Sequence, residues 1–209
     1  MTLPKHRITI KHKGLLAAVA GVGAAAIGIG VVATAGATES KEAKSPVRKV
    51  VVKTTFSPVS AAPKAEAVTY DTELVPASSR VQVKEELRRS GGTRIELRLR
   101  DLVPHRVYGA HVHTKPCGEL PADSGPHYQN KLDPVQPSVD PDFANPRNEV
   151  WLDLTTNKDG SDRSIAIVDW RFREGGARSV VLHEMATSSH EGHAGTAGAR
   201  LACVNVPFE

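Results

Sequence analysis

The stretch "TRIELRLR", residues 93–100, alternates charged and apolar side chains over its length. Successive side chains of a β-strand point to opposite faces of the sheet. Ile95, Leu97 and Leu99 therefore share one face of an extended chain, and the charged residues share the other. This pattern predicts a strand with one face on a hydrophobic core and one face in water.

The same period of two recurs along much of the chain, between turn signals such as "SGG" and "NKDG". No segment after the N-terminal region has the spacing of a convincing amphipathic helix. We therefore predict an all-β protein, either a sandwich or a barrel. The other segments expected to form strands are residues 67–71, 80–87, 107–113, 149–154, 164–170, 178–184 and 199–206.

The charge is unevenly distributed along the 209 residues, of which 40% are hydrophobic and 24% charged. Residues 1–64 hold ten Lys or Arg against two Glu, whereas the rest of the chain holds 17 basic and 21 acidic residues. The basic isoelectric point thus comes from the N-terminal part, and we expect no nucleic-acid binding by the folded domain.

The N-terminus has the form of an export segment. A basic start, "PKHRITIKHK", precedes an uncharged run from Gly14 to Ala37. Residues 1–37 are therefore expected to be a cleaved signal peptide or a retained membrane anchor, and a membrane is a partner only in the second case. Residues 38–64, rich in Lys, Ser, Pro and Ala, are expected to be a disordered linker, which leaves residues 65–209 as the domain.

Export bears on the two cysteines, Cys117 and Cys203, because such a pair is usually oxidised outside the cytoplasm. We expect one disulfide. The protein would be secreted, held in the cell wall or periplasm, or anchored in the membrane facing outward.

The histidines in "GAHVH", residues 109–113, follow the same alternation. Ala110 and Val112 are expected to face the core, so His111 and His113 project together from the outer face, about 7 Å apart along the strand. His183 in "SVVLHE" and Asp153 in "EVWLDL" also point outward by this rule. Two imidazoles so placed are able to chelate copper or zinc, although exposed surface histidines would give the same pattern.

Several motifs decide between these readings. In their order and spacing, "GAHVH", "CGELPADSGPHY", "DLTTNKDG", "RSVVLHE" and "AGTAGARLAC" resemble the copper/zinc superoxide dismutase family over residues 65–209. The resemblance implies an eight-stranded Greek-key β-barrel or sandwich and superoxide as substrate. It places His111, His113, His127 and His183 as copper ligands, with His127 also bridging to zinc. It also implies that Arg200 guides the anion to copper and that Cys117 pairs with Cys203.

The sequence departs from this family at the zinc site. Residues 128–152 contain no histidine, and Asp153 alone remains at the position of the zinc aspartate, so zinc binding is doubtful. We expect Asp153 instead to accept a hydrogen bond from the ring nitrogen of His127 that faces away from copper. Solvation is the more ordinary role for the acidic residues of the intervening loop, Asp133, Asp140 and Asp142.

The segment between His183 and Arg200 also departs from the family, because it is short and has Thr187 where an aspartate is expected. Its "HEGH" motif, with His190 and His193, is consistent with a second metal, copper delivery or a proton relay, and equally with exposed loop histidines.

The sequence is therefore consistent with two functions. One is an exported, copper-dependent superoxide dismutase, and the other is a non-enzymatic relative that stores or delivers copper or acts at the cell surface. Retention of Arg200 favours the enzyme, because a store has no need of a residue that attracts anions. The sequence does not indicate an oligomeric state.

Overall fold

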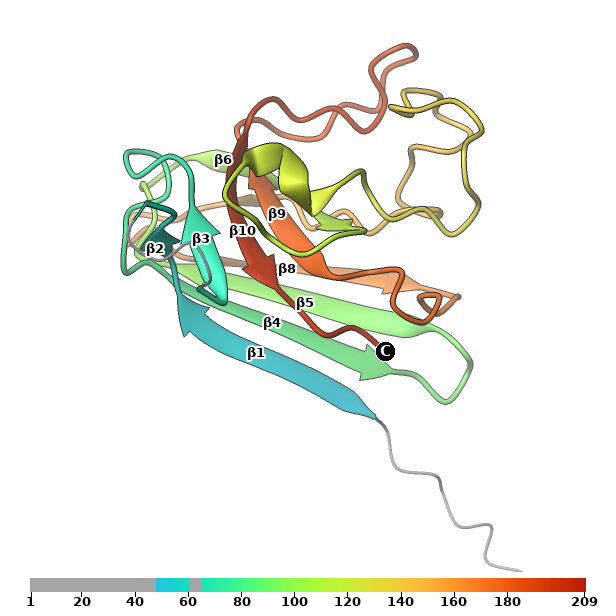
Figure 1. Ribbon diagram of the computed structural model, residues 1–209, viewed down its shortest axis with the longest axis horizontal. Helices are drawn as coiled ribbons and strands as arrows, with labels where there is room; N and C mark the ends of the chain where they lie inside the picture. Colours follow the sequence, from blue (N-terminus) through green and yellow to red (C-terminus); the bar gives the residue numbers. More distant parts are fainter. Residues whose placement is uncertain (1–47, 61–64) are drawn as a thin grey trace, which may run out of the picture. The chain divides into compact units, whose positions relative to one another are not determined.

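The computed structural model describes residues 48–60 and 65–209, which form two stacked β-sheets and one short 3₁₀ helix (Figure 1). One sheet has the order β1 (Lys49–Thr55), β4 (Arg80–Leu87), β5 (Thr93–Arg100) and β8 (Asp162–Val168). The other has the order β2 (Ser57–Pro58), β3 (Ala67–Thr69), β10 (Arg200–Asn205), β9 (Ser179–His183), β6 (Val107–His113) and β7 (Leu154–Thr155). The helix η1 (Pro121–Ser124) lies in the loop after β6.

The alternation read from the sequence explains how the sheets pack. Ile95, Leu97 and Leu99 are fully buried between the two sheets, while Arg100 on the same strand is exposed. From the six-stranded sheet, Ala110 of β6 enters the same core. Removing this apolar surface from water is the main force that holds the sheets together.

The all-β prediction is confirmed, and the architecture is a sandwich. In the described part of the chain, no hydrogen-bonded pairing joins the edge strands β1 and β8 of the four-stranded sheet to the other sheet, so the barrel does not close. These residues form ten strands where eight were expected.

The linker prediction for residues 38–64 is wrong over part of its length. Residues 49–55 form β1, which pairs with β4 along its whole length and buries Val52. Because "KVVVKTT" alternates like the other strands, pairing with β4 outweighs the polar composition of its surroundings. Residues 1–37 lie outside the described residues, and no helix within the described ranges is long and apolar enough to cross a membrane.

The predicted strand at residues 149–154 is mostly irregular. Only Leu154 belongs to a strand, β7, and Trp151 forms a single bridge to His111. The alternation nevertheless persists, because Val150 and Leu152 are buried while Trp151 and Asp153 turn to the other side.

Candidate metal centre

Three strands of the six-stranded sheet place side chains at one spot on its outer face. His183 of β9 lies directly opposite Gly109 of β6 and Arg200 of β10. His111 and His113 follow on β6 with the same parity as Gly109. The sequence argument about sides of the strand is therefore correct.

A fourth histidine reaches this spot from a loop. His127 follows η1 and forms an isolated bridge with His113. One ligand atom from each of His111, His113, His127 and His183 lies within 4.8 Å of the others. Metal–imidazole bonds of about 2 Å require nitrogens on opposite sides of an ion to be about 4 Å apart, so the group is nearly arranged for one ion.

The histidines differ from the sequence expectation in their exposure. His111 and His113 are fully buried, because the loops after β6 and β9 cover the outer face of the sheet. Burial, followed by the repulsion of the neighbouring imidazoles, holds the pKa of His111 and that of His113 well below the usual range. Burial likewise lowers the pKa of His183 to about 3. All three rings are neutral at pH 7, the form that binds metals.

Hydrogen bonds to groups outside the cluster occupy one ring nitrogen of His111 and one of His113, while His113 Nε2 lies 3.4 Å from His183 Nε2. His111 Nε2 lies 2.6 Å from Thr187 Oγ1, and His113 Nδ1 lies 2.9 Å from the carbonyl oxygen of Gly125. His111 Nδ1 is buried and has no hydrogen-bond partner within the described residues. A buried polar atom left without a partner is costly, and a metal ion bound by the group would give this nitrogen a partner.

His127 is held by Glu149, a residue that the sequence analysis did not single out. His127 Nδ1 lies 2.9 Å from Glu149 Oε2. The same carboxylate, which is 2% exposed, also accepts hydrogen bonds from Trp151 Nε1 at 2.8 Å and Gln129 Nε2 at 2.9 Å. Glu149 has the same parity as Trp151 and Asp153 in "EVWLDL", and this alternation is the sequence feature that could have identified it.

The expected contact between Asp153 and His127 is not formed. Asp153 instead accepts hydrogen bonds from the Thr187 hydroxyl at 2.6 Å and the Thr187 backbone N–H at 2.7 Å. Thr187 in turn contacts His111, so Asp153 orients a different histidine from the one predicted. Gly109 allows the loop that contains Thr187 to approach β6 closely, since a Cβ at this position would lie 2.5 Å from the carbonyl oxygen of Met185 in that loop.

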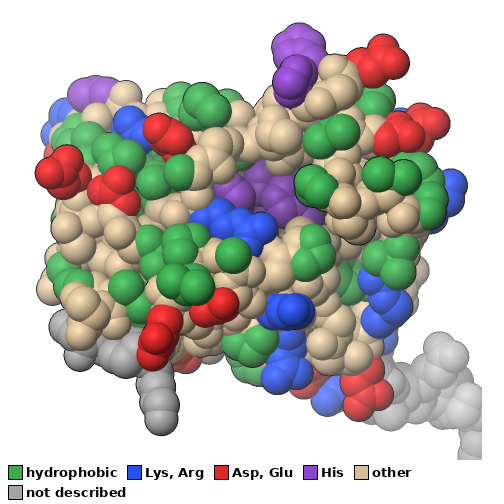
Figure 2. Space-filling model, turned by 45° about the horizontal axis from the view of Figure 1, so that its top comes forward, with side chains coloured by type: hydrophobic (Ala, Val, Ile, Leu, Met, Phe, Trp, Pro, Cys, Tyr) green, Lys and Arg blue, Asp and Glu red, His purple; other side chains and the backbone are tan. Residues whose placement is uncertain are grey.

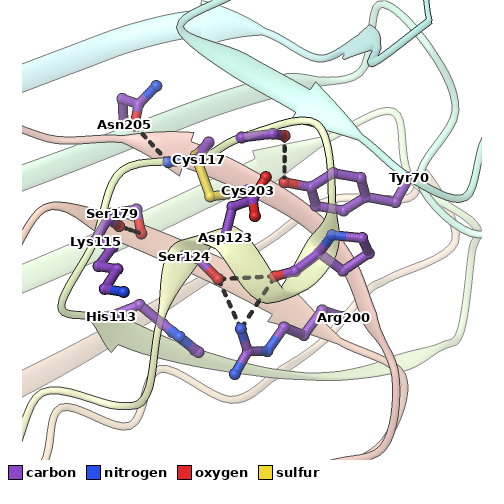
Figure 3. Close-up of a disulfide and its surroundings, with 12 residues drawn as sticks. Tyr70, His113, Lys115, Cys117, Asp123, Ser124, Ser179, Arg200, Cys203 and Asn205 are labelled. Carbon is purple, nitrogen blue, oxygen red and sulfur yellow. Dashed lines mark hydrogen bonds between the residues drawn. A yellow bond between two sulfur atoms is a disulfide. The ribbon is translucent and has the colours of Figure 1, made fainter. Parts of the chain in front are cut away.

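Arg200 lies beside the group, and the loop that contains η1 fixes its position. Its Nη1 donates hydrogen bonds to the carbonyl oxygen of Pro121 at 3.0 Å and to Ser124 Oγ at 2.9 Å (Figure 3). The predicted disulfide is present, with Cys117 and Cys203 joined at 2.08 Å. It ties the start of this loop to β10, the strand on which Arg200 lies.

The group is open to solvent on one side. Histidine side chains are visible in a hollow of the surface, next to a basic side chain (Figure 2). The corresponding cleft has a volume of about 350 Å³, and its lining includes His127, His183, Glu149 and Arg200. A small anion therefore has access to the histidines past a guanidinium group.

Comparison with known proteins finds solved structures that are similar at low sequence identity. No family model and no curated protein matches the sequence. Among solved structures, a double mutant of a SOD-like protein from Bacillus subtilis is similar, with a TM-score of 0.46 and 18% identity over 69% of this chain and 98% of that chain. A single mutant of the same protein gives 0.47 and 18%, over 69% and 99% of the two chains. The clock protein EA4 gives 0.48 and 19%, over 77% and 94%.

The remaining candidates lie apart from this group. Asp133 is buried, and its carboxylate accepts hydrogen bonds from Val135 N and Ser138 Oγ, so it holds its own loop together. Asp140 and Asp142 are exposed, as are His190 and His193. In the described part of the chain, the four histidines are the one group of three or more potential ligands.

Proposed function

We propose that this protein is an exported, copper-dependent superoxide dismutase that works without zinc. The observation that carries the proposal is a group of four histidines, one with a buried ring nitrogen that has no hydrogen-bond partner among the described residues, next to a cleft lined by Arg200. The reaction converts two superoxide anions and two protons into one O₂ and one H₂O₂. Bound copper would supply the electron exchange, alternating between its two oxidation states.

Copper suits the donor set. Imidazole nitrogens are good ligands for copper and zinc, whereas manganese and magnesium prefer oxygen ligands. The group contains four histidines and no carboxylate. His111 would bind through Nδ1, because Thr187 occupies Nε2, and His113 through Nε2, because the carbonyl of Gly125 occupies Nδ1.

Glu149 supports the zinc-free form of the proposal. In the resembled family the far nitrogen of the bridging histidine binds zinc, but here His127 Nδ1 is occupied by the Glu149 carboxylate. A carboxylate that accepts the N–H of a ligand histidine fixes the ring orientation and its tautomer. Trp151 and Gln129 hold the carboxylate in place, so His127 would be free to bind copper through Nε2 without a second ion on Nδ1.

Arg200 supports an enzymatic role. Two hydrogen bonds hold the guanidinium group at the edge of the cleft, and it stays positively charged at any physiological pH. A fixed positive charge beside the opening raises the local concentration of a small anion and aligns it with the histidines. Copper storage makes no use of such a charge.

The proposal is tested by loading the full chain with copper and measuring copper, zinc and superoxide consumption on the same sample. We expect about one copper per chain, little zinc, and activity. Arg200→Ala should retain copper but lose most of the activity and its dependence on salt. Arg178→Ala removes an exposed arginine outside the cleft and serves as the control.

The opposite results discriminate between the alternatives. Tight copper binding without superoxide consumption would favour storage or delivery of the metal. Activity that requires stoichiometric zinc would contradict the zinc-free form.

A further inference from the structure

The outer face of the four-stranded sheet carries a concentration of positive charge. Lys53 of β1 lies in a cross-strand row with Gln82, Arg98 and Arg163, and the neighbouring row contains Arg80 and Arg100. We call the set Lys53, Arg80, Arg98, Arg100 and Arg163 the basic sheet face. It is distinctive because residues 65–209 as a whole carry more acidic than basic residues.

Few carboxylates neutralise this face. Asp101 pairs with Arg80, and Glu96 pairs with Arg98 and Arg94. Glu86, on the same side of the sheet, pairs with Lys49, Lys84 and Arg94, which are not part of the basic sheet face. Among the described residues, no ion pair is formed by Lys53, Arg100 or Arg163, although all three are exposed. Like charges held side by side attract a concentrated negative charge from solution.

The basic sheet face is also hollowed. A shallow cleft of about 430 Å³ runs between β1, β4 and β5, and Lys53, Arg80, Arg98 and Arg100 line it together with polar neighbours. Guanidinium groups bind phosphate oxygens through paired N–H donors. The cleft therefore suits a phosphate group that approaches from above the sheet.

Aliphatic side chains share this side of the sheet. Val51 of β1 and Ile165 and Ile167 of β8 point outward with the cations, and they are 56%, 40% and 56% exposed. A soluble polyanion would cover the charges and leave these side chains in water. The interface of a lipid bilayer accepts both kinds of group, since phosphates lie next to the upper part of the acyl chains.

The position of the face fits a surface-bound domain. The metal-site loops lie over the six-stranded sheet, so the outer side of the four-stranded sheet faces away from them (Figure 1). The described chain starts at Arg48, one residue before β1, which is an edge strand of this sheet. If the N-terminal segment is a retained anchor, the attachment enters the domain at the same sheet.

We propose that the basic sheet face docks on an anionic phospholipid bilayer, with its arginines and Lys53 at the phosphates and its aliphatic residues at the interface. This contact is independent of the enzymatic proposal. It leaves the histidine cleft open on the opposite side of the domain.

The test measures how fast individual lysines are acetylated when the full chain is mixed with lipid nanodiscs. The discs contain either zwitterionic lipid alone or about one-third phosphatidylglycerol. Each basic residue near an anionic surface contributes enough binding energy to change occupancy about fivefold. We therefore expect Lys53 to be acetylated at least about fivefold more slowly on the anionic discs, with the effect lost at high salt. Lys115 and Lys131, which lie in loops of the other layer, should keep their rates and serve as internal references.

Two variants sharpen the test. Arg100→Gln with Arg163→Gln removes two of the face's cations that form no ion pair and should abolish most of the protection of Lys53. Arg147→Gln with Arg178→Gln makes the same change in charge elsewhere and should leave the protection intact. Equal acetylation of Lys53 on both kinds of disc, or equal protection of Lys115 and Lys131, would overturn the proposal. Protection of Lys53 by soluble polyphosphate but not by anionic discs would also overturn it, in favour of a polymeric anion.

Discussion

Glu149 places a negative charge against a cluster that otherwise consists of imidazoles. It accepts three hydrogen bonds, one of them from His127, so its orientation is fixed. Under the proposed function, Glu149 would orient the ring of His127 as zinc does in the resembled family. The consequences are measurable at single residues.

Glu149→Gln should weaken copper binding by about tenfold to a hundredfold, the usual effect of removing a partner of a ligand histidine. The amide cannot accept hydrogen bonds from all three donors, so the ring of His127 loses its orientation. Competition with a copper chelator measures the affinity, and Glu174→Gln, an exposed change outside the site, is the control. An affinity within twofold of that of the wild type would show that His127 needs no such partner.

Thr187→Val should also weaken copper binding, by roughly tenfold. Valine has nearly the shape of threonine but lacks the hydroxyl group that links Asp153 to His111. Thr187→Ser keeps the hydroxyl and should bind copper nearly as well as the wild type. The same chelator competition compares the two, and equal loss in both would indicate a packing effect instead.

The sequence predicted the side of the sheet on which three of the histidines lie, but it did not predict the residues that contact them. Alternation along strands gives the side of the sheet for His111, His113 and His183 without knowledge of the loops. Glu149 and Asp153 have the same parity in a segment that is mostly irregular, so their partners depend on the path of the loops above them. Burial of the histidines has the same origin, because it is the loops that cover them.

At the scale of elements, the loop from Cys117 to η1 links the disulfide to the guanidinium group. Arg200 donates to two acceptors at the end of this loop, and the disulfide fixes its beginning to β10. The loop then continues to His127. The disulfide that attaches this loop to β10 should therefore affect both the stability and the activity of the protein.

Replacing both Cys117 and Cys203 by serine should lower the free energy of unfolding by about 4 to 5 kcal/mol in the chain-entropy model, given the separation of 86 residues between the cysteines. Superoxide consumption should fall more than copper content does, because the acceptors of Arg200 lose their anchor. Urea unfolding and metal analysis on the same preparation measure both effects. If the folded variant kept full activity per bound copper, the position of Arg200 would not depend on the disulfide.

The regular strands were predicted closely, because β4, β5 and β6 have the bounds expected from their alternation. β1 was missed because its surroundings are rich in Lys, Ser and Pro, and composition says nothing about a pairing partner some thirty residues away. Strand alternation also does not distinguish a closed barrel from a sandwich, since both bury one face of each strand.

At the scale of the whole molecule, one buried carboxyl group links stability to pH. Glu85 of β4 points into the core with Val83 and Leu87, and it accepts a hydrogen bond from the backbone N–H of Glu209 at 3.1 Å. Burial, reinforced by the negative charge of Glu209, raises the pKa of Glu85 from 4.5 to about 7. The folded protein thus holds this proton more tightly than the unfolded chain does.

Stability from Glu85 is therefore fully present below pH 4.5 and is lost as the pH rises to about 7. Glu85→Gln should match the wild type near pH 4.5 and exceed it at pH 8, by at most about 3 kcal/mol. Urea unfolding of both proteins at the two pH values isolates this group, because all other titrating groups are shared. A difference that does not change with pH would show that Glu85 ionises normally.

The sandwich also has a front and a back, since the histidine cleft and the basic sheet face belong to different sheets. On a bilayer, the basic sheet face would contact the lipid and the histidine cleft would face away from the membrane. The rate at which superoxide is removed at the membrane would then depend on the number of protein molecules per unit area of membrane. Dilution of the surrounding medium would have little effect on this rate. Superoxide approaching from outside would meet the copper before it met the lipid, and the hydrogen peroxide formed would be released on the side away from the cell.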